Sequence, residues 1–199
     1  RNAFLGVDGG TTDGDYNIAI GSYTLDAVTS GASNIAIGHN AGTAISSGHA
    51  NVLVGYEAGM ALDNLSNSIA VGYGALKTET TSGGSVAIGT YALEDQNVAD
   101  ANNTAVGHNA GYNLTTGTDS VYVGYQAGGS GTITGNHNVA IGKKAGYDLT
   151  SGHSNVLIGR HAAENFTDNA SNVAIGYNAL QLANTGEHYN VAVGTSAMA

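Results

Sequence analysis

The sequence repeats one nine-residue phrase twelve times, close to Asn-Val/Ile-Ala-Ile/Val-Gly-x-x-Ala-Gly/Leu, and this periodicity constrains the fold more than any other feature. The central glycine of the phrase returns every 17 or 18 residues after one opening interval of 15. A fixed period in this range indicates one supersecondary unit stacked along an axis. We therefore predict a single elongated repeat domain over residues 1–199, without the irregular pocket that most enzymes need. The anchor glycines are Gly6, Gly21, Gly38, Gly55, Gly72, Gly89, Gly107, Gly124, Gly142, Gly159, Gly176 and Gly194.

A short β-branched segment precedes each anchor glycine. Val or Ile stands three residues and one residue before it, as in Ile18 and Ile20. This period-two alternation predicts a strand, whereas β-branched residues and a glycine in every segment disfavour helix. A second apolar position, seven residues after many anchors, predicts a less regular second strand on the return path. Val28, Ile45, Leu62, Leu114, Leu149 and Phe166 hold that position, and Glu79, Gln96 and Gly131 interrupt it, which predicts a partly buried or loosened face there.

A polar residue stands four positions before every anchor. In a stack of aligned coils these side chains would lie over one another and form a hydrogen-bonded ladder, as asparagines do in cross-β stacks. The alternative is that each is a turn-favouring residue at the start of a strand; we favour the ladder because the position is polar throughout. The column contains Asn17, Asn34, Asn51, Ser68, Ser85, Asn103, Ser120, Asn138, Asn155, Asn172 and Asn190.

A second glycine position lies seven residues before several anchors, often at the end of a Thr/Ser-Thr/Ser-Gly turn. Asn169 takes this position in one repeat, and asparagine tolerates left-handed backbone better than other non-glycine residues. The sequence therefore predicts a left-handed turn residue at each of these positions. Glycine occupies the position at Gly31, Gly48, Gly117, Gly135 and Gly152.

Both faces of the predicted strand are apolar. The Val/Ile pair points to one side, and between its members stands a mostly small residue such as Ala36 or Ala140. A narrow coil has only one interior, so the second apolar face needs a cover. We expect the Val/Ile pair inside each coil and the alanine stripe at an axis where identical chains meet.

The composition of the chain excludes several classes of binding partner and site. Fifteen acidic and five basic residues give a formal net charge of −10, which disfavours binding to nucleic acid or to anionic membranes. Cysteine is absent, so no disulfide or thiolate metal site forms. No apolar run approaches the roughly 18 residues of a spanning helix. The chain starts at Arg1 with no methionine or leader, so we expect it to be a piece of a longer protein.

The phrases NIAIGHNAG at residues 34–42, NVAIGKKAG at 138–146 and NVAIGYNAL at 172–180 resemble the head repeats of YadA-type trimeric adhesins. The 17-residue form with its Thr-Thr-Gly turn is similar to repeats in bacteriophage tail-fibre proteins. The resemblance covers the whole chain and implies an all-β, left-handed parallel β-roll of about twelve coils. It also implies a homotrimer that attaches to a host or surface.

Two departures from the adhesin pattern bear on which relative fits better. The adhesin repeat is usually shorter and often carries serine at positions where this chain has alanine, and this favours the fibre type. The sequence lacks a membrane anchor, a coiled-coil stalk and the chaperone segment that often follows fibre repeats. The alanines are Ala41, Ala58, Ala110, Ala127, Ala145 and Ala179.

The candidate metal ligands and acids support no catalytic or cofactor site. No two of the seven histidines are spaced as a ligand pair, and His39 and His108 share a slot with tyrosine, lysine and arginine, which indicates a solvated turn. The segment Asp8–Asp15 resembles a calcium loop but lacks its ligand spacing, so we expect an ordinary acidic turn. Glu94, Asp95 and Asp100 are interpreted as a solvated loop. The histidines are His39, His49, His108, His137, His153, His161 and His188.

Tyrosines recur in the slot after the anchor glycine, at Tyr56, Tyr73, Tyr125 and Tyr177. With Tyr23, Tyr91, Tyr112 and Tyr147 they could present rings to sugars or to a protein receptor. We favour the simpler interpretation that the rings pack over neighbouring turns.

Taken together, these patterns predict a non-enzymatic segment of a phage tail fibre with structural and attachment roles, with no cofactor and no metal. Its expected partners are two identical chains, neighbouring fibre or tail proteins, and a host glycan or protein receptor. A bacterial trimeric adhesin head is the alternative. A polysaccharide-degrading fibre enzyme is a third possibility, although acids do not recur between adjacent coils and no nucleophile or phosphate motif is present.

Overall fold

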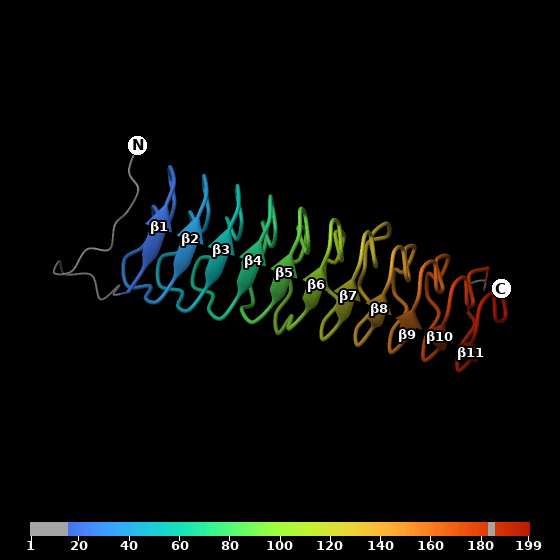
Figure 1. Ribbon diagram of the computed structural model, residues 1–199. Helices are drawn as coiled ribbons and strands as arrows, with labels where there is room; N and C mark the ends of the chain where they lie inside the picture. Colours follow the sequence, from blue (N-terminus) through green and yellow to red (C-terminus); the bar gives the residue numbers. More distant parts are fainter. Residues whose placement is uncertain (1–15, 183–185) are drawn as a thin grey trace.

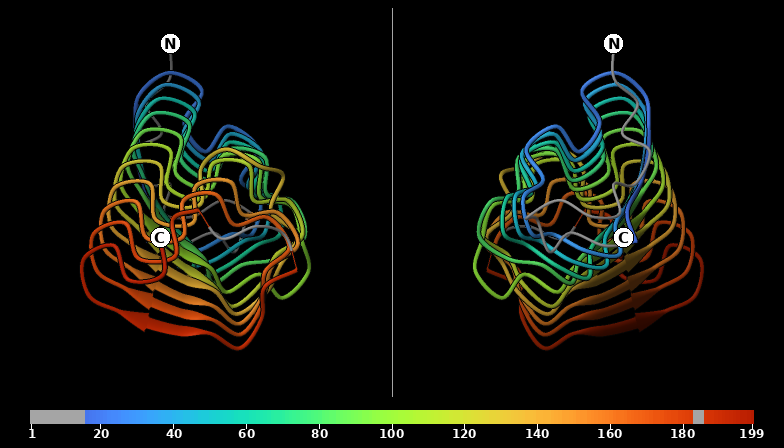
Figure 2. Two further views of the ribbon diagram at one scale, coloured as in Figure 1. Left: turned by 90° about the vertical axis from the view of Figure 1, so that its right-hand side faces the viewer. Right: turned by 90° about the vertical axis from the view of Figure 1, so that its left-hand side faces the viewer.

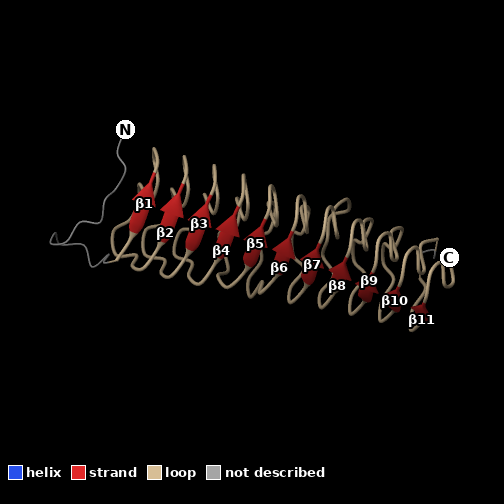
Figure 3. Ribbon diagram, in the orientation of Figure 1, coloured by secondary structure: helices blue, strands red, loops and turns tan. Residues whose placement is uncertain are grey.

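The computed structural model describes residues 16–182 and 186–199 and shows an all-β parallel solenoid with a 17-residue period (Figure 1). Eleven three-residue strands form one parallel sheet in chain order, and the rest of each coil is turns and loops (Figure 3). Pairing is strictly in register, so Ile18 faces Ile35 and Val173 faces Val191. The strands are β1 (Ile18–Ile20), β2 (Ile35–Ile37), β3 (Val52–Val54), β4 (Ile69–Val71), β5 (Val86–Ile88), β6 (Thr104–Val106), β7 (Val121–Val123), β8 (Val139–Ile141), β9 (Val156–Ile158), β10 (Val173–Ile175) and β11 (Val191–Val193).

The coil number is slightly below the expected twelve. Eleven of the twelve anchor phrases form a strand, and together they bound about ten complete coils. The first phrase, around Gly6, lies outside the described residues. Viewed along the stack, the coils lie behind one another, each displaced from the one before it, and the loops change shape along the stack (Figure 2).

The strands point their small residues inward, opposite to our expectation. The central residue of every strand is buried, while the flanking Val and Ile residues face outward and are partly or largely exposed. The physical reason is the narrow interior: Ala36 and Ala140 meet the facing wall of the same coil, where a β-branched pair from each rung has no room. The alanine stripe is therefore core, and the Val/Ile stripe is the uncovered face.

A large core residue from one wall lies against a glycine on the other. Leu53 packs between Gly42 and Gly59, where an added Cβ would lie 2.7 and 2.6 Å from its methyl carbons. Tyr122 fills the same space between Gly111 and Gly128. Where the strand supplies alanine, the opposite wall often supplies leucine: Leu25, Leu76, Leu93 and Leu180 are all buried. At these positions a large residue on one wall is therefore matched by a small one on the other.

The expected second strand does not form in the described residues. Ile45, Leu62 and Phe166 are buried as predicted, but their backbone is irregular and directly follows a turn. The only strand-like pairing on the described return path is one isolated bridge between Leu114 and Ile133. In each described coil the residues two and four after the anchor, and five before it, have left-handed φ. Three such residues bend the return path repeatedly, and an extended strand has no length in which to form.

The anchor glycines stack in one column and are required twice over. Their φ values lie between 127° and 143°, a region that side-chain-bearing residues rarely adopt. A Cβ at Gly142 would also lie 2.5 Å from the carbonyl oxygen of Gly159 in the next coil. The second glycine column has a different cause from the one predicted. Gly31, Gly152 and Asn169 do not have left-handed φ, and the two glycines are needed because the next coil's backbone approaches too closely for a Cβ.

The predicted polar ladder is confirmed. Asn51 Nδ2 donates to Asn34 Oδ1 at 2.9 Å, and the same oxygen accepts the Asn51 backbone N–H at 3.1 Å. The second Nδ2 hydrogen reaches the carbonyl oxygen of Leu65 in the following turn, at 2.8 Å. Asn155 and Asn172 repeat this stacking near the other end of the molecule. The ladder supplies partners for buried amides that the short strands leave unpaired.

Candidate functional site

The clearest departure from the repeat lies in residues 68–106, which span β4 to β6 and are called here the irregular segment. Here Ser68 and Ser85 replace asparagine in the ladder, and Glu79 and Gln96 replace apolar residues in the facing slot. We expected this face to be loosened, and that was wrong, because both Glu79 and Gln96 are fully buried. At the third interruption, Gly131, the nearby Ile133 is buried and supplies the missing apolar side chain.

Glu79 and Gln96 form a closed hydrogen-bond network. Gln96 Nε2 donates to Glu79 Oε2 at 2.8 Å, and the backbone amides of Thr81 and Ser82 donate to Glu79 Oε1 at 2.8 and 3.0 Å. Gln96 Nε2 also donates to Ser85 Oγ at 2.9 Å. The long Gln96 side chain therefore reaches across the core to Ser85, where the ladder has only a short hydroxyl side chain. Each donor and acceptor is matched, and this makes the buried carboxylate tolerable.

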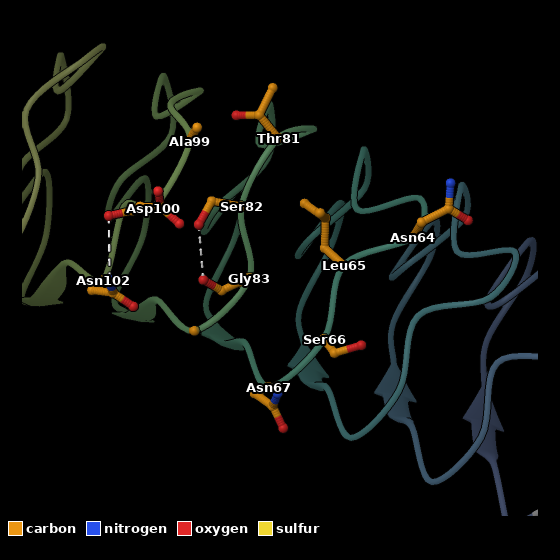
Figure 4. A pocket seen from close by; sticks show the side chains of 11 residues that line it. Asn64, Leu65, Ser66, Asn67, Thr81, Ser82, Gly83, Ala99, Asp100 and Asn102 are labelled. Carbon is orange, nitrogen blue, oxygen red and sulfur yellow. Dashed lines mark hydrogen bonds between the residues drawn. The ribbon is translucent and has the colours of Figure 1, made fainter.

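An open groove of about 490 Å³ lies over the same coils. Three consecutive turns line it, with residues 81–84 between residues 64–67 and 99–102 (Figure 4). Gly83 packs against the Ser66 backbone too closely for a side chain, and Ala101 N donates to Ser82 Oγ at 3.0 Å. The lining is mostly hydroxyls and carboxamides, with Asp100 as its one ionisable side chain. The paired Ser68 and Ser85 with Glu79 and Gln96 were the sequence signal of this region, and our prediction missed the groove.

The groove has no set of groups that indicates catalysis or metal binding. No cluster of three His, Cys, Asp or Glu residues suited to a metal ion occurs in residues 16–182 and 186–199. Glu94 and Asp95 lie apart from the groove, so the expected acidic loop contributes only Asp100 to it. The acidic segment Asp8–Asp15 lies outside the described residues.

A second candidate surface is the outer face of the sheet, called here the Val/Ile face. All its positions are Val or Ile except Thr104 in β6. Ile37, Ile88 and Ile141 are 37–39% exposed, and Val191 is 69% exposed. With rungs at about 4.8 Å and strands about 10 Å long, the strip covers roughly 500 Å², at the upper end of apolar patches on monomers and typical of interaction surfaces.

A column of rings runs along the edge just after the strands. His39 stacks on Tyr56 at 5.3 Å between centroids, and Tyr56 stacks on Tyr73 at 4.9 Å with 9° between planes. Tyr91 and Tyr112 continue the column edge-on. Tyr56 and Tyr73 remain 40% and 45% exposed. The rings therefore pack over neighbouring turns as we favoured, with their edges open to solvent.

Farther along the same edge, two consecutive cations lie between two tyrosines. Lys143 Nζ lies 5.7 Å from the Tyr125 ring centroid, and Arg160 Cζ lies 5.6 Å from that of Tyr177. Such distances give cation–π attraction. The expectation of a solvated slot holds for His39, His108, Lys143 and Arg160, which are all exposed.

Two acids in equivalent slots, five residues after their anchors, differ in electrostatics. Burial alone would raise the pKa of Glu164, but hydrogen bonds from Gln181 and His161 and the charge of Lys144 bring that pKa below its ordinary value. Burial raises the pKa of Glu94, and a hydrogen bond from Tyr112 opposes this only in part. His161 Nδ1 lies 2.8 Å from Glu164 Oε2, so this histidine belongs to the hydrogen-bonded cluster around Glu164.

The other histidines are scattered along the stack. His49 Nδ1 and His188 Nδ1 accept backbone amides of Ala32 and Ala170. His137 lies 3.7 Å from Asp119, and His153 lies beside Ser154. His49, His137 and His188 each contact a residue of the preceding coil, and no two of them share a partner, so this arrangement does not favour a shared metal.

Comparisons with known proteins give no match: no family model, no curated protein and no solved structure matches the chain. Within the described residues there is no helix capable of crossing a membrane.

Proposed function

We propose that this chain is a structural shaft segment that assembles as a homotrimer and serves attachment in a phage tail fibre. The observation that carries the proposal is the Val/Ile face, an apolar strip along the whole described sheet that no residue of 16–182 or 186–199 covers. Burying the β-branched residues of this strip would stabilise an assembly by about 25 cal/mol for each Å² of apolar surface that is removed from water. A second and third copy provide a cover of equal length and pitch.

The trimer now rests on a different stripe from the one predicted. Alanine fills the coil interior, so the sheet's outer valines and isoleucines are the surfaces that would meet at a common axis. The number three and the left-handed winding come from the resemblance to YadA-type head repeats. The attachment role follows from the same resemblance, with the adhesin head as the alternative.

Analytical ultracentrifugation of the chain tests the assembly. We expect a mass three times 19.8 kDa. The variant Ile37→Lys/Ile88→Lys/Ile141→Lys places three charges on the Val/Ile face and should sediment as a monomer. The control Thr116→Lys/Ser151→Lys/Asn165→Lys adds the same charge at exposed positions away from the strands and should remain trimeric.

Thr104→Val provides a test that does not depend on a disruptive change. It completes the apolar strip, so we expect the trimer to dissociate at lower concentration than the wild type. A wild-type chain that stays monomeric and cooperatively folded at all concentrations would overturn the trimer.

The attachment role has its own tests. A tail fibre predicts neighbouring tail-assembly genes and a chaperone segment in the complete reading frame, whereas an adhesin predicts a signal peptide and a C-terminal membrane barrel. Loss of capsule or glycan polymer on incubation with the chain would favour an enzyme instead, and we expect the polymer to stay intact.

A further inference from the structure

Two exposed cations occupy the same slot in consecutive coils. Lys143 follows the anchor Gly142, and Arg160 follows the anchor Gly159. Because β8 and β9 pair in register, with Ile141 opposite Ile158, the two residues lie one rung apart, at about 4.8 Å between backbones. Adjacent like charges at such a spacing are destabilising unless an anion lies between them.

Neither cation has a carboxylate partner among the described residues, although other lysines of the chain do. Lys77 Nζ lies 2.7 Å from Glu57, and Lys144 Nζ lies 3.7 Å from Glu164. Of the four lysine and arginine residues that the structure describes, Lys77 and Lys144 pair with carboxylates and Lys143 and Arg160 do not, in a chain with a net charge of −10. Lys143 and Arg160 therefore form a local positive site on an otherwise acidic rod.

Tyrosines bracket this pair on the same edge. Tyr125 lies beside Lys143 and Tyr177 beside Arg160, and both rings are close to half exposed. Cation–π contact with the rings keeps the charged ends near the edge column. The phenol edges add hydrogen-bonding and apolar surface next to the charges, a combination suited to a sugar that carries an acid group.

We propose that Lys143 and Arg160, flanked by Tyr125 and Tyr177, bind the carboxylate or phosphate groups of an acidic glycan. This rests on the proposed attachment role and names the ligand class for it. Arginine binds either anion through two parallel hydrogen bonds, and lysine adds a point charge one rung away. Nucleic acid binding needs a broad basic face along the phosphate backbone, which two neighbouring cations do not provide.

Binding to immobilised glycans tests the site. The probes are polygalacturonate for carboxylates, a poly(glycerol phosphate) teichoic acid for phosphates, and dextran as the neutral control. We expect the wild-type chain to bind at least one acidic probe, more weakly as salt rises, and not to bind dextran. Comparing the two acidic probes identifies which anion is preferred.

The variant Lys143→Gln/Arg160→Gln should lose about tenfold or more in affinity. Its matched control is Lys77→Gln/Lys144→Gln, which removes the same net charge from cations that already have carboxylate partners and should change affinity less than about twofold. Equal losses in the two variants would overturn the site, because they would show a general effect of net charge. Absence of binding to both acidic probes would also overturn it.

Sedimentation of the same samples separates this inference from the proposed assembly. We expect both double variants to remain trimeric. If Lys143→Gln/Arg160→Gln dissociates the trimer, the two cations act between chains and the glycan site is wrong while the trimer stands. If the wild type is monomeric yet binds an acidic probe through Lys143 and Arg160, the trimer is wrong and the site stands.

Discussion

Two parts of this rod have the same backbone and different interiors. In residues 138–175, called here the regular segment, asparagines form the ladder and Leu149 and Phe166 fill the facing slot. In the irregular segment, serines stand in the ladder, and Gln96 reaches across to hydrogen-bond both Ser85 and Glu79. Strand register and the glycine column are the same in both. The glycine framework therefore determines the path of the backbone in each coil, and either apolar or polar side chains can fill the interior if their volumes and hydrogen bonds are matched.

Replacing an anchor glycine should destabilise the fold most, and it tests whether the two segments share the glycine framework. Gly142→Ala in the regular segment and Gly72→Ala in the irregular segment should each lower the free energy of unfolding by about 4 kcal/mol or more, as measured by urea unfolding. Both glycines have left-handed φ, and at both a Cβ would lie against the carbonyl of the next coil. Gly194→Ala has similar φ but open space around it, so about 1–2 kcal/mol is expected. A small cost at Gly72 alone would mean that the irregular segment has a different framework.

The next effect tests the polar core. Gln96→Leu restores an apolar side chain but removes the one side-chain donor to Glu79 Oε2, so we expect a loss of about 3 kcal/mol. Glu79→Leu/Gln96→Leu should be less destabilised than the sum of the two single variants, by at least about 1 kcal/mol. Urea unfolding of all four proteins completes the cycle. Additive losses would show that the two side chains act independently.

The ladder offers a matched pair of truncations. Asn155→Ala removes hydrogen bonds to Asn138 and Asn169 and leaves Asn172 without its acceptor, so about 2 kcal/mol is expected to be lost. Ser68 Oγ is buried without a hydrogen bond, so Ser68→Ala should be neutral or slightly stabilising. Thermal unfolding of the two variants measures the difference. A large cost at Ser68 would indicate a partner for its hydroxyl.

Replacing Glu164 or Glu94 should have the smallest effect on stability. These two acids occupy the same slot in the two segments. Because the folded-state pKa of Glu164 is lowered, its charge stabilises the fold above the ordinary value of 4.5 and that contribution is lost as pH falls through the folded pKa. Glu164→Gln should therefore cost up to about 1 kcal/mol at pH 7 and little in acid. The pKa of Glu94 is raised, so its charge opposes folding at pH 7 and Glu94→Gln should stabilise slightly. Urea unfolding at pH 7 and about pH 3 checks both signs; equal signs at pH 7 would contradict the difference between the slots.

The sequence predicted the features that depend on local pattern. The anchor spacing located the strands, and the polar column predicted the ladder, because side chains four residues before each anchor superimpose once the coils stack. It did not predict which face of the strand lies inside. Both faces are apolar, so the choice depended on the coil's width, which the turns at residues such as Glu57 and Leu76 determine through left-handed φ. The groove was missed because it arises from three turns that differ together, at Ser66, Gly83 and Asp100.

In-register pairing makes each coil interchangeable at its boundaries. A coil contacts only the one before and the one after it, through a surface that is nearly the same at every rung. Duplicating or deleting one 17-residue coil would therefore leave the joint intact and change the length of the rod by about 4.8 Å. Gain or loss of a whole repeat in the gene would therefore change the length of the solenoid without changing its fold.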